Sequence, residues 1–430
     1  MNIGSLFPDR RVFWAFLACF FMGIGSLTAK PLELSVQADS AILMNADDGA
    51  ILFEKNAKKS QDPASLTKIA TAIYTLKVRG ERLDKMIPAE HDSVASISDA
   101  ELRRSNYTLP AHWLVPGTSH IGIKRGEELS LKDLLYGMMV ASAGDASNVI
   151  AQYVGGSVPT FMELLNEYLQ GIGCYGTTFK NPHGLHHPDH RTTAYDMAIL
   201  TREALKNQTF CDIVKTVQYT RPQTNKQKPI TLIQTNRLLK RGKFYYSKAI
   251  GVKTGYTSAA QNTLVAAARD KNRLLIAVLM KCSDRDEIFR DAIKLFETAF
   301  REKAIRRTLL PRGLQKAALS VEGGAGPIRT CLEKDITLDF FPAEEPKVKC
   351  LLSWDKVAIP VEKGQRVGVL SFQDQNGRVL LTEPLFAFEK VGYSWYYRLK
   401  QFFGGGIFRT IIGVILSLLL FLSLLLMLRR

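Results

Sequence analysis

Residues 63–68, with the sequence PASLTK, constrain what this chain can fold into more than any other stretch. The apolar residues that follow recur at helical spacing, which predicts the inner face of a helix whose first turn carries Ser65 and Lys68. These apolar residues are Ile69, Ala70, Ala72, Ile73 and Leu76. Residues three positions apart share a helix face, so we expect the amine of Lys68 to reach the hydroxyl of Ser65.

This pair suits nucleophilic catalysis. A serine is a weak nucleophile until a neighbouring base removes its proton. A lysine can be that base only if burial or nearby cations depress its pKa. Backbone N–H groups at the helix N-terminus can also stabilise an oxyanion. The alternative is a helix-start serine beside a surface lysine, because Ser-x-x-Lys occurs by chance in many chains.

Two further stretches favour the catalytic interpretation. Ser142 lies in the sequence MVASAGDA at 139–146, and Lys253-Thr254-Gly255 lies in AIGVKTGYT at 249–257, ahead of a strand-like run at 262–268. In this combination and order the stretches resemble the three active-site motifs of serine penicillin-binding proteins and β-lactamases. The chain is most similar to D-alanyl-D-alanine carboxypeptidases, the low-molecular-mass penicillin-binding proteins. The similarity runs from about residue 34 to residue 390 and includes the segment 181–196.

The resemblance implies an α+β fold. We expect a β-lactamase/transpeptidase-like catalytic domain, with helices on an antiparallel sheet, then a small all-β domain and a C-terminal transmembrane helix. The expected boundaries are a signal peptide at 1–29, the catalytic domain at 30–304, the β-rich domain at 305–390, and a linker with anchor at 391–430. Short runs separated by Gly, Pro and Asp after residue 305 agree with the β-rich domain.

The resemblance also implies three catalytic residues. Ser65 attacks the penultimate D-Ala carbonyl of a peptidoglycan stem pentapeptide, and Lys68 takes its proton. Ser142 relays the proton to the departing D-Ala, and water then hydrolyses the acyl-enzyme. β-Lactam antibiotics are expected to acylate the same serine, and no cofactor is implied.

Substrate binding is expected along the third motif. Lys253 and Thr254 meet the terminal carboxylate, and Gly255 allows the substrate backbone to approach the strand. The backbone N–H groups of Ser65 and Tyr256 form the oxyanion hole. Backbone pairing along this strand resembles strand addition to a sheet edge.

The chain departs from the family pattern at two positions. The second motif of the family is Ser-x-Asn, but here it ends in Gly144, which lacks the amide that contacts substrate. We therefore expect Gly144→Asn to raise turnover. An arginine expected near position 288 is replaced by Ile288, with Arg285 and Arg290 nearby.

Other functions remain open. A transpeptidase or endopeptidase shares the first half of the chemistry, and Gly144 leaves room for a catalytically weak wall-binding or scaffold protein. A β-lactamase is disfavoured because no Glu-x-x-x-Asn loop is found.

The histidine-rich run at 183–190 suggests a metal site, since imidazole is a common zinc ligand. However, Pro182, Gly184 and Pro188 make this run a loop, and no His-Glu-x-x-His occurs. We therefore expect no metal. The five cysteines of the mature chain are widely spaced; Cys331 and Cys350 either form a disulfide or stay free thiols.

The two ends of the chain predict export and anchoring. Arg10 and Arg11 precede an apolar run and a small-residue cleavage site near Ala29. Residues 410–428 carry no charge and are long enough to span a bilayer, with aromatic residues before them and two arginines after. We expect an inner-membrane protein with its catalytic domain on the periplasmic side.

Composition agrees with that location. The formal net charge is +16 over 430 residues, which suggests contact with something anionic. The basic residues are scattered and no nucleic-acid-binding motif is found, so an anionic envelope is a simpler partner than nucleic acid.

Overall fold

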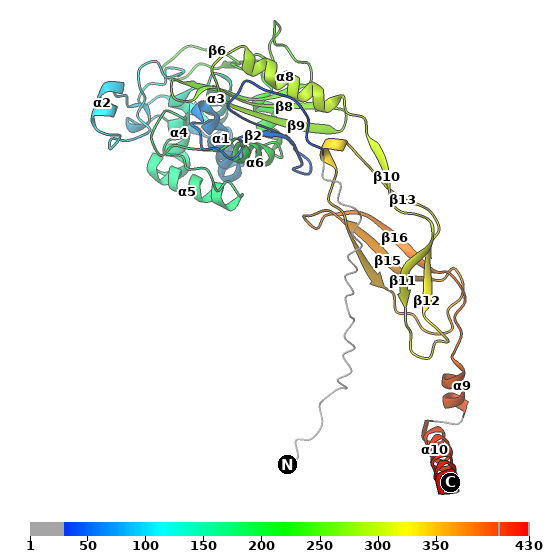
Figure 1. The fold of residues 1–430 in the computed structure, drawn as a ribbon. Helices are drawn as coiled ribbons and strands as arrows, with labels where there is room; N and C mark the ends of the chain where they lie inside the picture. Colours follow the sequence, from blue (N-terminus) through cyan, green and yellow to red (C-terminus); the bar gives the residue numbers. More distant parts are fainter. Residues whose placement is uncertain (1–29, 403–404, 429–430) are drawn as a thin grey trace, which may run out of the picture. The chain divides into compact units, whose positions relative to one another are not determined.

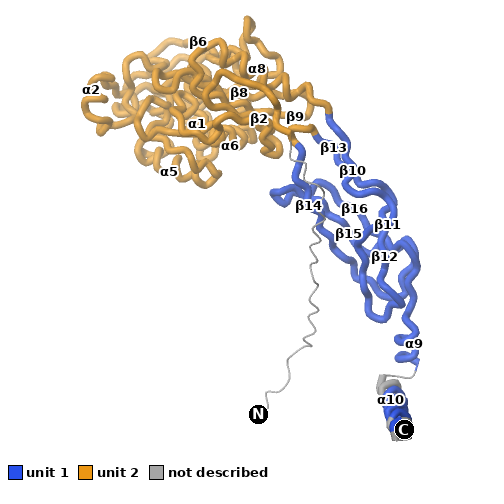
Figure 2. Tube along the Cα trace, viewed as in Figure 1, with its two compact units in different colours: residues 1–28, 304–340, 345–430 blue, residues 29–303, 341–344 orange. Residues whose placement is uncertain are grey.

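The computed structural model describes residues 30–402 and 405–428, which form two compact units (Figure 2). The first, here called the sheet–helix unit, contains residues 30–303 and 341–344. The second, here called the β-rich unit, contains 304–340 and the chain from 345 onward. The chain therefore changes unit beside the boundary expected at 304, and the return of 341–344 to the first unit was not foreseen. The expected signal peptide at 1–29 lies outside the described residues.

A five-stranded antiparallel sheet forms the centre of the sheet–helix unit, in the order β2-β1-β9-β8-β7 (Figure 1). Its strands are β1 (Ser40–Asn45), β2 (Ile51–Lys55), β7 (Ala249–Thr257), β8 (Gln261–Asp270) and β9 (Arg273–Cys282). Two apolar runs, at 41–44 and 50–53, flank a turn at 45–49 and predict a hairpin. The hairpin is present, because β1 pairs with β2 across this turn, in which Gly49 has a φ of +82°. That backbone conformation is easy for glycine and unfavourable for other residues.

Side chains alternate between the two faces of this sheet along each strand. Both faces are buried, because helices cover each of them. Val265 and Val278 pack against a group of helices on one face. Leu264 and Leu279 point to the other face, where helix α8 (Glu287–Phe300) covers them. The unit is thus a three-layer arrangement of helices, sheet and helix (Figure 1).

Helix α1 (Thr67–Arg79) follows a 3₁₀ turn, η1 (Ala64–Leu66), and is buried on more than one side. The sequence predicted one apolar inner face, yet the polar residues Thr67, Lys68 and Thr71 are buried as well. The cause is that α3, α4, α5, α6 and α7 all contact α1. Buried hydroxyls need partners, and those of Thr67 and Thr71 donate to the carbonyls of Ala64 and Pro182 at 3.0 and 2.7 Å.

Five helices surround α1, and all but α4 begin at a polar side-chain cap. They are α3 (Leu131–Val140), α4 (Gly144–Gly155), α5 (Val158–Gly171), α6 (Ala194–Ala204) and α7 (Gln208–Val214). In α3, α5 and α6 a Ser or Thr hydroxyl accepts from the N–H three residues on, which satisfies a helix-end donor. The amphipathic pattern over 158–171 predicts a helix, and α5 confirms it.

Short elements complete the sheet–helix unit. They are η2 (Gly80–Arg82), β3 (Met86–Pro88), η3 (Asp92–Val94), α2 (Asp99–Arg104), β4 (Glu128–Ser130), β5 (Gln218–Arg221), β6 (Ile230–Ile233) and η4 (Pro342–Glu344). Strand β3 pairs with β4, and β5 pairs with β6. The last of these elements, η4, is the returning segment: Arg273 pairs with Glu344 at 2.7 Å, and Ala343 donates its N–H to Glu302 at 3.0 Å.

The sequence predicts helical structure over 129–154 with a turn at Ser142, and both are confirmed except at the start of this range. Residues 128–130 form β4, and the helical part is broken into α3 and α4 at residues 141–143. Ser142, with a φ of +62°, stands at the break.

The β-rich unit contains two sheets. Strands β10 (Ile305–Leu310) and β13 (Ile336–Phe340) pair with each other. A second sheet has the order β11-β12-β16-β15-β14, with β11 (Gly313–Leu319), β12 (Ile328–Leu332), β14 (Lys349–Trp354), β15 (Arg366–Gln373) and β16 (Val379–Ala387). The short apolar runs at 336–338, 348–352, 367–370 and 379–381 predict strands and correspond to β13–β16, whereas β10, β11 and β12 were not predicted individually. Among the described cysteines, Cys331 and Cys350 are both free.

Two helices follow the β-rich sheets: α9 (Trp395–Phe402) and α10 (Gly405–Leu428). Large apolar side chains of α10, such as Leu420 and Phe421, are exposed. Within the residues described, none of the helices combines the length and apolarity needed to cross a bilayer. The transmembrane helix expected at 410–428 is therefore not supported by this structure.

Candidate active site

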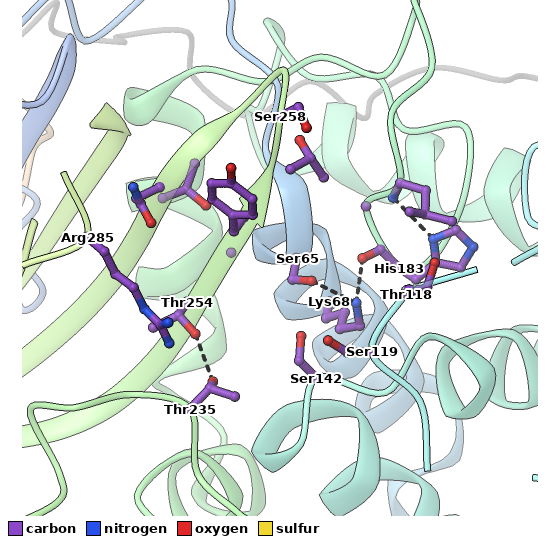
Figure 3. Close-up of a pocket in the computed structure, with 18 of the residues that line it drawn as sticks. Ser65, Lys68, Thr118, Ser119, Ser142, His183, Thr235, Thr254, Ser258 and Arg285 are labelled. Carbon is purple, nitrogen blue, oxygen red and sulfur yellow. Dashed lines mark hydrogen bonds between the residues drawn. The ribbon is translucent and has the colours of Figure 1, made fainter. Parts of the chain in front are cut away.

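A cavity of about 740 Å³ opens in the sheet–helix unit between η1, β7 and the loops facing them (Figure 3). Six of the seven predicted site residues line it: Ser65, Lys68, Ser142, Thr254, Gly255 and Tyr256. The structure thus brings together three motifs that are far apart in the chain. The seventh residue, Lys253, does not line the cavity, and its side chain is completely buried.

Ser65 and Lys68 are hydrogen-bonded. The Lys68 amine lies 3.0 Å from the Ser65 hydroxyl oxygen and donates to the carbonyl of His183 at 2.5 Å. Burial, and secondly the charge of Lys253, hold the pKa of Lys68 well below its ordinary value. A neutral amine that donates one N–H to His183 keeps its lone pair for the proton of Ser65. The arrangement therefore suits Lys68 as a general base.

The backbone at Ser65 is held by close contacts with two glycines. A Cβ on Gly184, whose φ is +91°, would lie 1.8 Å from the carbonyl oxygen of Ala64. A Cβ on Gly255 would lie 2.8 Å from the backbone nitrogen of Ser65. The Thr263 hydroxyl also bonds the carbonyl of Pro63 at 3.1 Å. Only glycine fits at both places, so these contacts fix the position of the Ser65 N–H.

The third motif lies on β7. Burial lowers the pKa of Lys253 to about 7, and its amine donates to the carbonyl of Thr254 at 3.0 Å. The Thr254 hydroxyl is 2.7 Å from that of Thr235, which also lines the cavity. Tyr256 is 66% exposed, so its side chain is available to a ligand, whereas its backbone belongs to the strand.

Ser142 is buried and its backbone is left-handed, which is unfavourable for a serine. Backbone strain of this kind is concentrated at functional sites. In Figure 3 its side chain points toward the space around Lys68. The neighbouring Gly144 starts α4 and donates its N–H to the carbonyl of Ser119 at 2.8 Å. This bond brings the loop at 115–119 over the helix end and into the cavity wall.

Asp145 holds the other end of this loop. Its carboxylate accepts from the backbone N–H groups of Ile121 and Ile123, at 3.2 and 2.9 Å. Burial raises the pKa of Asp145 in spite of these bonds. The sequence predicts no role for Asp145 or Ser119, because a helix-start acid and a loop serine carry no distinctive spacing.

Two residues of the histidine-rich run contact the segment that carries Ser65 and Lys68. His183 is completely buried, donates to the carbonyl of His112 at 3.0 Å, and has its pKa lowered to about 3 by burial. His190 is buried beside Thr67, 2.8 Å from its hydroxyl, and burial lowers its pKa well below the ordinary value. Both rings are therefore neutral. The described residues hold no cluster of His, Cys, Asp or Glu that could bind a metal ion.

The three residues noted around position 288 differ in whether they line the cavity. Ile288 and Arg285 line the cavity, whereas Arg290 pairs with Glu287 and does not. Sequence reasoning noted the arginines but could not tell which one reaches the site. Thr235 was missed, because a lone threonine in a loop carries no signal.

Comparisons with known proteins agree with one another. The family described as D-alanyl-D-alanine carboxypeptidase matches residues 26–284, more than half of the chain. The chain is 32% identical over 368 residues to D-alanyl-D-alanine carboxypeptidase DacF of Bacillus subtilis, covering 83% of this chain and 86% of that protein. It is 29% identical to DacC of Escherichia coli, covering 86% and 90%. Penicillin binding protein 5 from Haemophilus influenzae is a structural neighbour, with TM-score 0.57, 25% identity, and coverage of 84% and 100%.

Proposed function

The chain belongs to the D-alanyl-D-alanine carboxypeptidase family, and from this premise we propose that it removes the terminal D-Ala from peptidoglycan stem pentapeptides through an acyl-enzyme on Ser65. The observation that carries the proposal is the buried Lys68 amine 3.0 Å from the Ser65 hydroxyl. A lysine whose pKa is depressed this way can deprotonate a serine at neutral pH.

The proposed reaction has two halves. Lys68 takes the Ser65 proton while Oγ attacks the penultimate D-Ala carbonyl. The C–N bond breaks, and the proton reaches the leaving amine by way of Ser142. Water then attacks the ester, which releases the shortened peptide and restores Ser65.

Substrate binding is proposed along β7. The N–H groups of Ser65 and Tyr256 stabilise the oxyanion, and the close contact at Gly255 keeps the Ser65 N–H in place. Thr254 and Lys253 bind the terminal carboxylate, Thr254 by its hydroxyl and Lys253 by its charge. Burial lowers the pKa of Lys253 to about 7, so this charge weakens as the pH rises above neutrality.

We propose residues 1–29 as an export signal, 30–304 as the catalytic domain and 305–390 as a β-rich domain on the periplasmic side. We further propose that 391–430 anchors the protein to the inner membrane, supported by the uncharged stretch 410–428. The exposed apolar side chains of α10 favour contact with lipid.

A fluorescent penicillin tests the proposed nucleophile. The β-lactam ring carbonyl takes the scissile position and its leaving group stays tethered, so a stable ester forms. We expect the label on Ser65 by peptide mass mapping. Ser65→Ala should lose about 10⁴- to 10⁶-fold in rate, because the remaining groups cannot act alone.

The same variant should remain folded. The residues capping η1 and α1 are Pro63 and Leu66, so Ser65→Ala removes no capping bond. A label on another residue, or a folded wild type that neither labels nor cleaves pentapeptide, would contradict the proposal and favour a wall-binding protein.

A further inference from the structure

The residue before the nucleophile has a strained backbone. Ala64 is buried and has a φ of +49°, in the left-handed region that is unfavourable for alanine. A conformation of this kind persists only where surrounding contacts hold it. The carbonyl of Ala64 and the N–H of Ser65 belong to one planar peptide group. The contacts that hold this carbonyl therefore also set the direction of the Ser65 N–H, a proposed donor to the oxyanion.

A chain of hydrogen bonds ends at this carbonyl. The Thr67 hydroxyl donates to the Ala64 carbonyl at 3.0 Å and lies 2.8 Å from Nε2 of His190. The backbone N–H of Lys180 donates to Nδ1 of the same ring at 3.0 Å. Because Nδ1 is an acceptor, the neutral imidazole carries its proton on Nε2. Nε2 then donates to the Thr67 oxygen, which leaves the hydroxyl hydrogen of Thr67 for the carbonyl of Ala64.

Packing holds the ring of His190 in place for this chain. The ring is buried and stacks on Phe179, with the two ring centroids 4.8 Å apart. Burial also holds the pKa of His190 well below its ordinary value, which keeps the ring neutral and its Nδ1 able to accept. The Ala64 carbonyl accepts the backbone N–H of Thr67 as well. Successive hydrogen bonds polarise one another in a low-dielectric interior, so donors to a carbonyl make the N–H of the same peptide group a stronger donor.

Resting on the proposed function, we propose that Thr67 and His190 are positioning residues that orient and polarise the Ser65 N–H of the oxyanion hole. Neither residue lines the active-site cavity, so both act through the peptide group between Ala64 and Ser65. The substrate carbonyl oxygen gains negative charge when Ser65 attacks. A well-aimed N–H stabilises that charge more than it stabilises the neutral substrate. Loss of the chain should therefore slow the formation of the acyl-enzyme.

The experiment measures the ester carbonyl of the penicilloyl enzyme by infrared difference spectroscopy on the full-length protein. This carbonyl oxygen is expected to occupy the oxyanion hole, and its stretching frequency falls as hydrogen bonds to it strengthen. Thr67→Val removes the hydroxyl but keeps the shape of the side chain, so the band should move to higher frequency. The kcat/KM for the pentapeptide should fall roughly tenfold, less than for the loss of a whole oxyanion donor. Thr67→Ser keeps the hydroxyl and should retain the wild-type band and rate.

A second variant, His190→Phe, keeps a ring against Phe179 and removes both ring nitrogens. Its band should move in the same direction by a smaller amount, since the Thr67 hydroxyl remains. The matched control is Thr71→Val. Thr71 is a buried threonine on the same helix, and its hydroxyl donates to the carbonyl of Pro182 at 2.7 Å. The control should lose a similar amount of stability in urea and leave the band in place.

A band that stays at the wild-type frequency in folded Thr67→Val or folded His190→Phe overturns the proposal. So does a band that moves equally in Thr71→Val. If one of the two variants does not fold, the other still decides. Failure of the proposed function gives a different result, because the wild type would then form no ester on Ser65 and would show no band to compare.

Discussion

Lys253 is completely buried, and burial lowers the pKa of its amine to about 7, from 10.5 in an unfolded chain. Between these two values the unfolded state binds more protons than the folded state. The free energy of unfolding should therefore rise with pH in this window. The contribution of Lys253 is fully present above about pH 10.5 and is lost as the pH falls through 7.

We predict that wild type gains stability relative to Lys253→Met between pH 7 and 10. Methionine fills a similar space and has no proton to lose, so the other titrating groups cancel in the comparison. Urea unfolding midpoints at pH 7, 8, 9 and 10 measure the effect. Lys132→Met, at an exposed site, should show a constant difference across the same range. A constant difference for Lys253→Met would mean that the amine is charged when buried.

At the scale of elements, the loop at 114–119 covers the start of α4. A Cβ on Gly144 would lie 3.1 Å from Leu114 Cδ2 and 3.2 Å from Thr118 Cγ2. Both distances are tighter than ordinary packing, so a larger residue would push on the cavity wall. The sequence led us to expect that Gly144→Asn raises turnover, but these contacts favour the opposite result.

We now predict that Gly144→Asn lowers kcat/KM on the pentapeptide by roughly tenfold. Gly144→Ala should cause much of the same loss, because the Cβ alone makes the contacts. Leu114→Ala should restore part of the activity of the Asn variant. Steady-state kinetics on all four proteins provide the check. A Gly144→Asn enzyme faster than wild type would show that the missing amide, not the space, limits the reaction.

Elements with strong local signals were predictable from the sequence. Two short apolar runs on either side of a turn indicated β1 and β2, and a long amphipathic pattern indicated α5. Tertiary packing decided the remainder. The burial of α1 on several sides depends on contacts between distant segments. For the same reason, the motifs predicted Ser65 beside Lys68, while the place of Thr235 in the cavity wall appeared only in the folded chain.

For the whole molecule, the candidate site lies in one unit. All residues lining the active-site cavity fall between positions 65 and 289, inside the sheet–helix unit. We predict that removing residues 404–430 leaves cleavage of a soluble pentapeptide unchanged and moves the protein from the membrane fraction to the soluble fraction. Fractionation followed by the peptide assay tests both parts. A folded but inactive truncated protein would show that the C-terminal segment does more than anchor.

The return of residues 341–344 to the sheet–helix unit affects how this protein is made. Arg273 is buried and bonds Glu344, which lies 71 positions later and reaches the ribosome exit only after β10–β13 have been synthesised. Until then Arg273 has Glu302 and the carbonyl of Ala299 as its partners in this unit. A chain usually folds domain by domain as it emerges. Here the first unit cannot complete its packing until part of the second has been translated.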